Sequence, residues 1–186
     1  MKKLTNEEQK EFDEIAKIII NNKEYQRRKE FKHHGEETVY DHCLKVAEIA
    51  YKMAKKRNLR IKETVIGALL HDFYYEPWQD NTEKKKFFKK HGFVHAAEAL
   101  ENSRKEFGDL INPLIGDIIS KHMFPLNIKL PKYKETWVVT TADKIASLNV
   151  LKQPKKWYRF IGVRKMKFKG KKTYKSKNKN LENKYK

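Results

Sequence analysis

The residues best suited to chemistry in this chain are of the types that bind metal ions. His71 and Asp72 stand side by side directly after the apolar segment 65–70. Neutral imidazole and carboxylate together suit Mn, Fe, Co, Ni or Zn. Further candidates lie before and after this pair, each within an apolar helical pattern or at the end of one: His42, His91, His95, His122 and Asp143.

Burying so many titratable groups separately would cost several kcal/mol for each group, and shared metal ions would offset that cost. One divalent ion needs three or four protein ligands, so these candidates are enough for one ion or for two. Two ions can lower the pKa of a water molecule between them and direct it at phosphorus. A lone histidine such as His42 on a buried helix face is more often an ordinary core residue, so the interpretation rests on the whole set.

Helices are needed to bring these side chains together, and apolar residues three and four apart predict them. Thr5 and Glu8 have the spacing of a capping box, which predicts the start of a first helix. Thr38 is expected to cap the helix that carries His42. The segment 61–70 predicts a helix that ends at His71.

The second half of the chain predicts three more helices. The first starts in segment 91–95, after a polar connection over 79–90, and ends near Gly108. The next starts at Asn112–Pro113 and has His122 in its last turn. The third covers about 137–148 and contains Asp143. With no convincing strand or repeat, the sequence predicts an all-α fold of about six helices.

The aromatic segment 73–78 contains a proline and is expected to be a loop. Its rings either form one wall of a pocket or cap the core, and both interpretations stay open. The single cysteine, Cys43, excludes an intramolecular disulfide and any cysteine-based zinc finger. Its apolar surroundings favour a small buried residue over a nucleophile.

Positive charge is concentrated near the C-terminus. Residues 152–186 hold fifteen lysines and arginines against Glu182, so they contribute +14 of the formal net charge of +19. We therefore expect a globular unit over 1–151 and a lysine-rich extension over 152–186. No window is apolar enough for a membrane span and the N-terminus lacks a signal-peptide core, which favours a cytoplasmic protein.

The C-terminal extension alternates basic and aromatic residues, as in Trp157–Phe160. Basic residues attract phosphate and aromatic rings stack on bases, so RNA or an anionic membrane surface would fit. The simpler alternative is a solvated segment that aids solubility. We expect Trp157–Phe160 to dock on the core and the part from Gly170 onward to be disordered.

The order His…His-Asp…His…His…Asp resembles the HD-domain superfamily of metal-dependent phosphohydrolases. The resemblance covers roughly residues 38–148, most of the globular part. It includes local segments as well as order: Tyr40–Ala47, Ala68–Asp72, Ile118–His122 and Ala142–Lys144. It implies an HD-domain helical bundle with a core over 38–148.

The resemblance also implies roles for the candidates. His42, His71, Asp72 and Asp143 match the one-metal set of the family. His122 and either His91 or His95 match the extra ligands of two-metal members. Segment 95–99 resembles the start of a family helix but has alanine at positions 96 and 99, where the family has proline and glycine. We favour His95 as the ligand.

The activity that the resemblance implies is hydrolysis of a small phosphoester, with a nucleotide as the expected substrate. Asp72 would bridge the metal ions, with His95 beside it. Lys144 directly follows a ligand and would bind phosphate or else lie solvated, and His34 is expected near the pocket mouth. Two alternatives stay open: an iron oxygenase with the same ligand order, and a nucleic-acid-binding protein that uses residues 152–186. The sequence leaves the oligomeric state undetermined.

Overall fold

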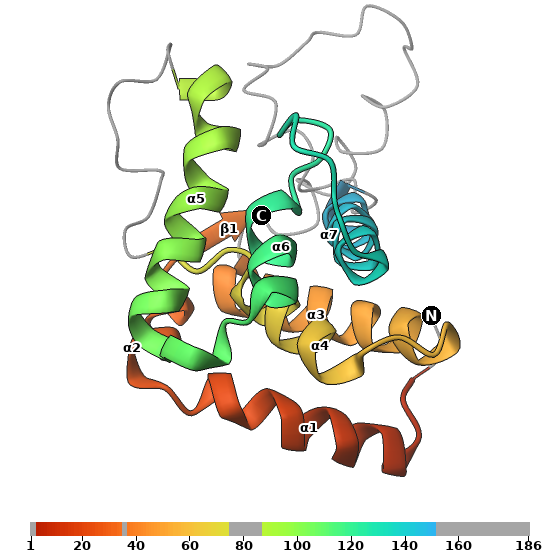
Figure 1. Cartoon of the computed structure of the whole chain (residues 1–186). Helices are drawn as coiled ribbons and strands as arrows, with labels where there is room; N and C mark the ends of the chain where they lie inside the picture. The colour runs from red at the N-terminus through yellow and green to blue at the C-terminus, as the bar shows by residue number, and fades with distance from the viewer. Residues whose placement is uncertain (1–2, 35–36, 75–86, 152–186) are drawn as a thin grey trace, which may run out of the picture.

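The computed structural model describes residues 3–34, 37–74 and 87–151, except for the side chains of residues 34, 87–94 and 149–151. The elements follow one another along the chain as shown in Figure 1. They are α1 (Asn6–Ile20), α2 (Lys23–Gln26), the 3₁₀ helix η1 (Arg27–Lys29), β1 (Lys32–His34), β2 (Glu37–Thr38), α3 (Val39–Lys56), α4 (Ile61–Leu70), α5 (Phe87–Phe107), the 3₁₀ helix η3 (Gly108–Leu110), α6 (Pro113–Lys121) and α7 (Lys134–Leu151).

The predicted all-α class is confirmed, with two differences in detail. A small antiparallel pair of strands joins Lys32 of β1 to Thr38 of β2, where the sequence predicted no strand. α5 begins at Phe87, so the connection predicted to reach residue 90 ends earlier. Propagating an existing helix costs far less than nucleating one. The packed part of α5 can therefore extend backward through a lysine-rich segment that has no apolar periodicity.

α4 is the central helix of the bundle. Every residue from Thr64 to Leu70 is buried, which fits a segment that is apolar on all sides. Figure 1 shows α4 between α1 and α6, and it also packs against α3 and α7. Because its C-terminal end lies inside the bundle, the two residues that follow, His71 and Asp72, are buried as well.

Capping residues fix where the neighbouring helices begin and end. Thr5 and Thr38 both form capping boxes, at the starts of α1 and α3. Asn112 caps α6, with Pro113 at the first helical position. Gly108 has a φ of +49°, a left-handed conformation that glycine adopts without strain, directly after α5. These starts and ends agree with the sequence patterns.

Gly67 lies where α4 approaches α6. A methyl group added at Gly67 would stand 2.7 Å from Cγ2 and 2.9 Å from Cβ of Ile118, which is too close for carbon atoms. The absence of a side chain at Gly67 is thus what lets the two helices pack at this distance.

Gly67→Ala is expected to lower the free energy of unfolding by about 1–3 kcal/mol, because α4 and α6 would have to separate. Gly116→Ala in α6 is the matched control. Its added methyl group would meet Leu100 Cδ1 at an ordinary 3.6 Å, and alanine favours the helix by about 1 kcal/mol. Urea denaturation measures both variants, and equal losses would contradict the close approach at Gly67.

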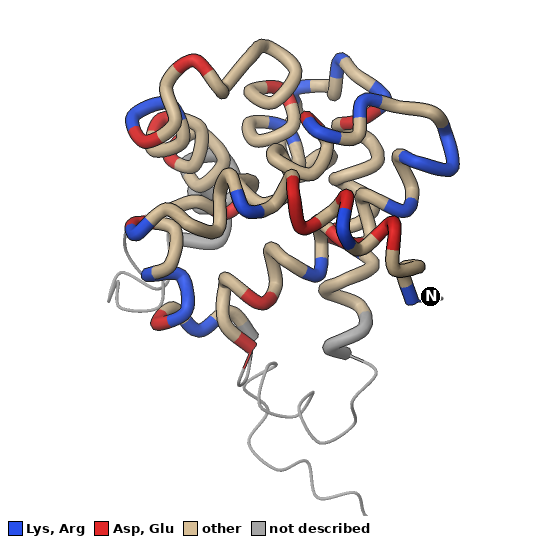
Figure 2. The backbone as a smooth tube through the Cα atoms, turned by 90° about the horizontal axis from the view of Figure 1, so that it is seen from below, with Lys and Arg blue, Asp and Glu red and all other residues tan. Residues whose placement is uncertain are grey.

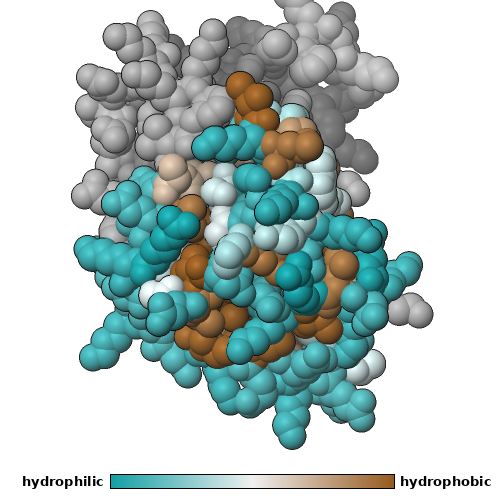
Figure 3. Space-filling model, viewed as in Figure 1, coloured by the Kyte–Doolittle hydropathy of each residue, from teal (hydrophilic) through white to brown (hydrophobic). Residues whose placement is uncertain are grey.

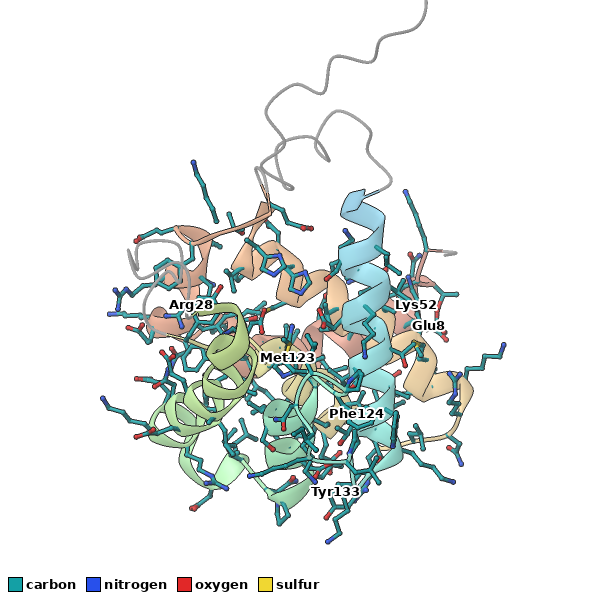
Figure 4. The ribbon with its side chains drawn as sticks, turned by 90° about the horizontal axis from the view of Figure 1, so that it is seen from above. Glu8, Arg28, Lys52, Met123, Phe124 and Tyr133 are labelled. Carbon is teal, nitrogen blue, oxygen red and sulfur yellow. The ribbon has the colours of Figure 1, made fainter. Side chains whose placement is uncertain are left out.

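Asp117 holds the connection between α6 and α7 in place. Its buried carboxylate accepts hydrogen bonds from the Lys132 backbone N–H at 3.0 Å and from Thr136 Oγ1 at 2.6 Å, and it pairs with Lys121. Burial alone would raise the pKa of Asp117, but the bonds from Lys121 and Thr136 lower it below its ordinary value. Figure 4 shows Phe124 of this connection beside α7, where its ring meets Trp137 edge to face at 5.1 Å.

Asp117→Asn is expected to cost about 1–3 kcal/mol of folding free energy at pH 7, because an amide replaces a charged acceptor. The carboxylate's contribution is fully present above its ordinary pKa of 3.8 and is lost as the pH falls through the lowered folded value. The difference between wild type and variant should therefore narrow below pH 4. Thermal melts from pH 7 to pH 3.5 measure it, and a difference that grows on acidification would disprove the assignment.

The surface of the described part is mixed in charge and largely polar. Figure 2 shows lysine and arginine interspersed with aspartate and glutamate along the helices. Figure 3 shows apolar atoms at the surface of the connection after α6, where Leu126, Ile128 and Leu130 are exposed. None of the helices in the described segments is long and apolar enough to span a membrane.

Candidate metal centre

Asp72 lies at the middle of a buried group of histidines. Its Oδ1 is 2.7 Å from Nε2 of His95 and 3.5 Å from Nε2 of His122, and its Oδ2 is 3.6 Å from Nε2 of His71. These side chains come from α5, the C-terminal cap of α6 and the end of α4. Three successive α-helices thus deliver their imidazoles to one carboxylate.

A second carboxylate, Asp143 of α7, approaches the same nitrogen of His71. Its Oδ1 is 3.1 Å from Nε2 of His42 in α3 and 4.0 Å from Nε2 of His71. His71 therefore contacts both carboxylates, with Asp72 at 3.6 Å and Asp143 at 4.0 Å from the same nitrogen. The two carboxylates thus belong to one cluster in which His71 is shared.

Backbone carbonyls fix the orientation of two of the histidines. Nδ1 of His71 donates to the Ala68 carbonyl at 2.7 Å, and Nδ1 of His122 donates to the Ile119 carbonyl at 2.8 Å. Since a carbonyl only accepts, each ring carries a hydrogen on Nδ1, and Nε2 is the nitrogen that holds the lone pair when the ring is neutral. Both Nε2 atoms are buried and make no hydrogen bond among the described residues. Two buried lone pairs facing carboxylates are what a metal ion requires.

The carboxylates are held in the ionised form that a metal needs. Burial would raise the pKa of Asp72, but attraction to His71 and His95 and the bond from His95 lower it well below its usual range. Burial would likewise raise the pKa of Asp143, and the bond from His42 together with the nearby His71 lowers it. Both groups therefore carry negative charge at neutral pH.

The pKa values of the clustered histidines are shifted in two opposite directions. Burial, together with repulsion from His71, lowers the pKa of His122 to about 4, so this ring is neutral at pH 7. Burial also opposes the charging of His42 and His95. Even so, the bond to Asp143 raises the pKa of His42 and attraction to Asp72 raises that of His95. A bound cation would replace the protons on these two rings.

The donor atoms fall into sets of the size that one ion uses. Those of His42, His71 and Asp143 all lie within 4.8 Å of one another, and so do those of His71, Asp72 and His122. Three ligands from the protein with space for a further group is the usual arrangement of a catalytic site. The residues present therefore fit a divalent transition metal, in one position or in two.

Six of the residues singled out from the sequence are brought together: His42, His71, Asp72, His95, His122 and Asp143. The side chains of His34 and His91 lie outside the described part of the structure, so predictions about them stay open. Lys144 is exposed and its Nζ donates to the Phe124 carbonyl. Binding a phosphate would require that side chain to leave this bond.

Sequence reasoning missed His33. This residue of β1 lies with Nε2 3.9 Å from Asp72 Oδ2, and its ring stacks on that of His42 with centroids 3.9 Å apart. A signal was present, because Phe31 and His33 are two residues apart and share one face of an extended chain. Phe31 is buried, which places His33 on the inner side as well.

The two aromatic residues directly after Asp72, Phe73 and Tyr74, are buried. Phe73 is buried within the main core. Tyr74 is buried between Phe31, on which it stacks at 6.2 Å, and His95, whose ring centroid is 5.0 Å away. Tyr74 thus packs against one side of the His/Asp cluster. The remaining predicted loop residues, 75–78, lie outside the described residues.

Comparison with protein families agrees with this geometry. The family model named HD domain matches residues 39–148, which is more than half of the chain. The chain belongs to the HD-domain family. Proteins with an HD domain are generally metal-dependent hydrolases, and the matched segment contains all six of the clustered residues predicted from the sequence. Searches of curated proteins and of solved structures give no significant match.

Proposed function

We propose that this HD-domain protein is a metal-dependent phosphohydrolase that cleaves a phosphoester, with a nucleotide as the favoured substrate class. The observation that carries the proposal is the pair of buried Nε2 lone pairs, on His71 and His122, that face an ionised Asp72. A core histidine that served packing alone would have both nitrogens paired. These two do not, and a cation explains both.

In this proposal His42, His71, Asp72 and Asp143 would hold one ion, and His122 and His95 would serve a second one together with Asp72. Bound ions would supply Lewis-acid stabilisation of the charge that develops on a phosphoryl group and would lower the pKa of a water molecule. The chain's own contribution is to fix the imidazole orientations through the Ala68 and Ile119 carbonyls. It also keeps the carboxylates ionised within a buried site.

Several finer points belong to the same proposal. We propose His95 rather than His91 as the ligand from α5, because His95 Nε2 reaches Asp72 Oδ1 at 2.7 Å. We also propose that residues 1–151 form the HD domain, that 152–186 are a separate extension, and that the protein acts in the cytoplasm. Lys144 and His34 are retained only as candidates for substrate contact.

A phosphatase screen of the full chain tests the activity. The protein is stripped of metal and reloaded separately with Mn, Co, Ni, Zn or Fe(II), and phosphate release is then measured from nucleotide and non-nucleotide phosphoesters. The proposal expects release that depends on added metal. Iron occupancy with oxygen consumption and no phosphate release would instead favour an oxygenase, the alternative with the same ligand order.

Binding of nucleic acid through the C-terminal extension is a separate question, because residues 152–186 lie outside the described segments. The sequence supports it only through the alternation of basic and aromatic residues. If affinity for RNA survives removal of residues 163–186, that part of the extension is not the binding element.

A further inference from the structure

The connection between α6 and α7 presents three aliphatic side chains to solvent. Leu126, Ile128 and Leu130 are 68%, 81% and 64% exposed, and Figure 3 shows apolar atoms at the surface there. Exposed aliphatic side chains gathered in one short segment mark a surface that binds another molecule, whereas single ones need no explanation. These three side chains are separate from the metal-ligand cluster and have no role in the function proposed above.

Hydrogen bonds hold the connection in this arrangement. Asn127, which is only 7% exposed, donates from Nδ2 to the Ser120 carbonyl at 2.8 Å. Its Oδ1 accepts a bond from the Lys129 N–H at 3.2 Å. Further along, the Lys132 N–H donates to the Asp117 carboxylate at 3.0 Å. The backbone is thus tied to α6 at two places, and the aliphatic side chains on either side of Asn127 are held outward.

The exposed charges of this connection are all positive. Between residues 122 and 134 every exposed charged side chain is a lysine, namely Lys129, Lys132 and Lys134. The only acids between residues 117 and 137 are Asp117 and Glu135, and both are buried and paired with basic side chains. The aliphatic side chains are therefore interspersed with positive charge that no acid of the same segment neutralises.

A cavity of about 710 Å³ lies between the connection, α5 and α6, and its charge has the same sign. Its charged lining consists of the basic side chains Arg104, Lys121 and Lys129 and one acid, Glu101. Lys121 is paired with Asp117, which leaves Arg104 and Lys129 against Glu101. The cavity gives a negatively charged group room beside the exposed aliphatic side chains.

This combination of side chains discriminates between possible partners. A second copy of the chain, docked with two-fold symmetry, would bring the same lysines face to face, which is unfavourable. Aliphatic side chains offer no ring on which nucleic-acid bases can stack. An anionic bilayer suits both components, because aliphatic side chains enter the interface while lysines stay at the head groups. Charge and apolarity together therefore favour a lipid surface.

We propose that the α6–α7 connection is a contact surface for anionic lipid membranes. Leu126, Ile128 and Leu130 enter the bilayer interface, and the neighbouring lysines bind the lipid phosphate groups. The contact is peripheral, since it places one connection at the membrane and leaves the helices outside it. This inference concerns a different part of the surface from the metal centre and does not depend on the phosphohydrolase function.

Residues 152–186 are also basic, so the test has to report on the connection itself. Ile128→Cys in the full chain, labelled with an environment-sensitive fluorophore, provides this readout, and the native Cys43 does not compete because it is buried. We expect a blue shift of the label with vesicles that contain phosphatidylserine and none with phosphatidylcholine alone. Ile18→Cys is the matched control, because Ile18 is also exposed but lies on α1, at the opposite end of the molecule in Figure 1. Its label should not shift.

Substitution of the lysines tests the electrostatic part with the same label at residue 128. The first variant combines Lys129→Gln, Lys132→Gln and Lys134→Gln. It should weaken vesicle binding about tenfold or more, since each lysine near such a surface contributes roughly fivefold. The control removes the same charge from α1 and α2 by Lys10→Gln, Lys17→Gln and Lys23→Gln. It should change the affinity less than about twofold, because salt screens distant charges.

Three results would overturn the inference, with circular dichroism as the check on the fold of each variant. The first is a label at residue 128 that does not shift with anionic vesicles, even if the protein sediments with them, because another surface would then make the contact. The second is a shift that grows with protein concentration in the absence of vesicles, which would identify a second copy as the partner. The third is an equal shift with polyglutamate, which would assign the surface to an acidic protein.

Discussion

Asp72→Asn is expected to abolish metal-dependent phosphoester hydrolysis, with a loss of about 10³-fold or more. Lewis-acid stabilisation by bound ions is worth several kcal/mol, and each 1.36 kcal/mol corresponds to a tenfold change in rate. Asp72 is the residue whose removal should cost the most, because it is the carboxylate nearest to His71, His95 and His122. Steady-state kinetics on the best substrate from the phosphatase screen measure the loss.

Two controls accompany this result: a matched variant of another buried aspartate, and a titration of His95. Asp117→Asn is the matched variant, since Asp117 is also a buried aspartate with a lowered pKa but bonds to Lys121 and Thr136 instead of the histidines. It should keep full activity. The pKa of His95, which Asp72 raises, should fall in Asp72→Asn, and titration by NMR would detect this. Activity within tenfold of wild type in a folded Asp72→Asn protein would contradict the assigned role.

Adding a divalent transition metal to the stripped protein is expected to raise the melting temperature by roughly 5–10 °C. An ion present at 100 times its Kd stabilises the folded state by about 2.7 kcal/mol, and a chain of this size gains about 2–4 °C per kcal/mol. The centre should respond strongly because the cation also neutralises Asp72 and Asp143. Thermal melts with and without Mn, Co or Zn measure the shift, and a chelator should reverse it.

The rise in melting temperature on adding metal should itself increase with pH. The raised pKa values of His42 and His95 stabilise the metal-free fold fully below their unfolded pKa near 6.5, and this contribution is lost as the pH rises through the folded values. Metal must displace the same protons, so its affinity increases with pH. The metal-induced shift should be larger at pH 8 than at pH 6. A larger shift at pH 6 would be incompatible with cation binding at these histidines.

His122→Asn separates the two proposed metal positions of the centre. His122 is neutral above its pKa of about 4, so a cation at this position displaces no proton at neutral pH. The variant should lose part of the metal-induced shift and keep the pH-dependent part that belongs to His42. Loss of the whole shift would mean that the two positions bind metal as one unit.

Most of the ligand cluster could be predicted from the sequence because each member lies on a helix with a readable apolar pattern. The spacing that marks Val46 and Ala47 as buried places His42 on the same face. The uniformly apolar 65–70 segment likewise places His71 and Asp72 at the end of a buried helix. Such patterns cannot predict which histidine lies beside which carboxylate. His95 contacts Asp72 and His42 contacts Asp143 because of the way α3, α5 and α7 pack.

One residue of the cluster, His33, was missed because it lies on an element without helical periodicity. β1 has three residues, too few for a strand pattern to stand out, so His33 was not recognised as part of the site. Lys144 follows Asp143 and was expected either to bind phosphate or to lie solvated, and this stays a prediction. Adjacent helical positions point about 100° apart, and in this structure its Nζ reaches the Phe124 carbonyl.

Elemental analysis of the purified full chain, after reconstitution with Mn, Co, Ni, Zn or Fe(II), tests the central claim most directly. The account predicts one or two transition-metal ions per chain in wild type, the same content in Asp117→Asn, and a loss of bound metal in Asp72→Asn. A wild-type chain that takes up no metal under any of these conditions would contradict the account and leave the six clustered side chains without a metal-binding role.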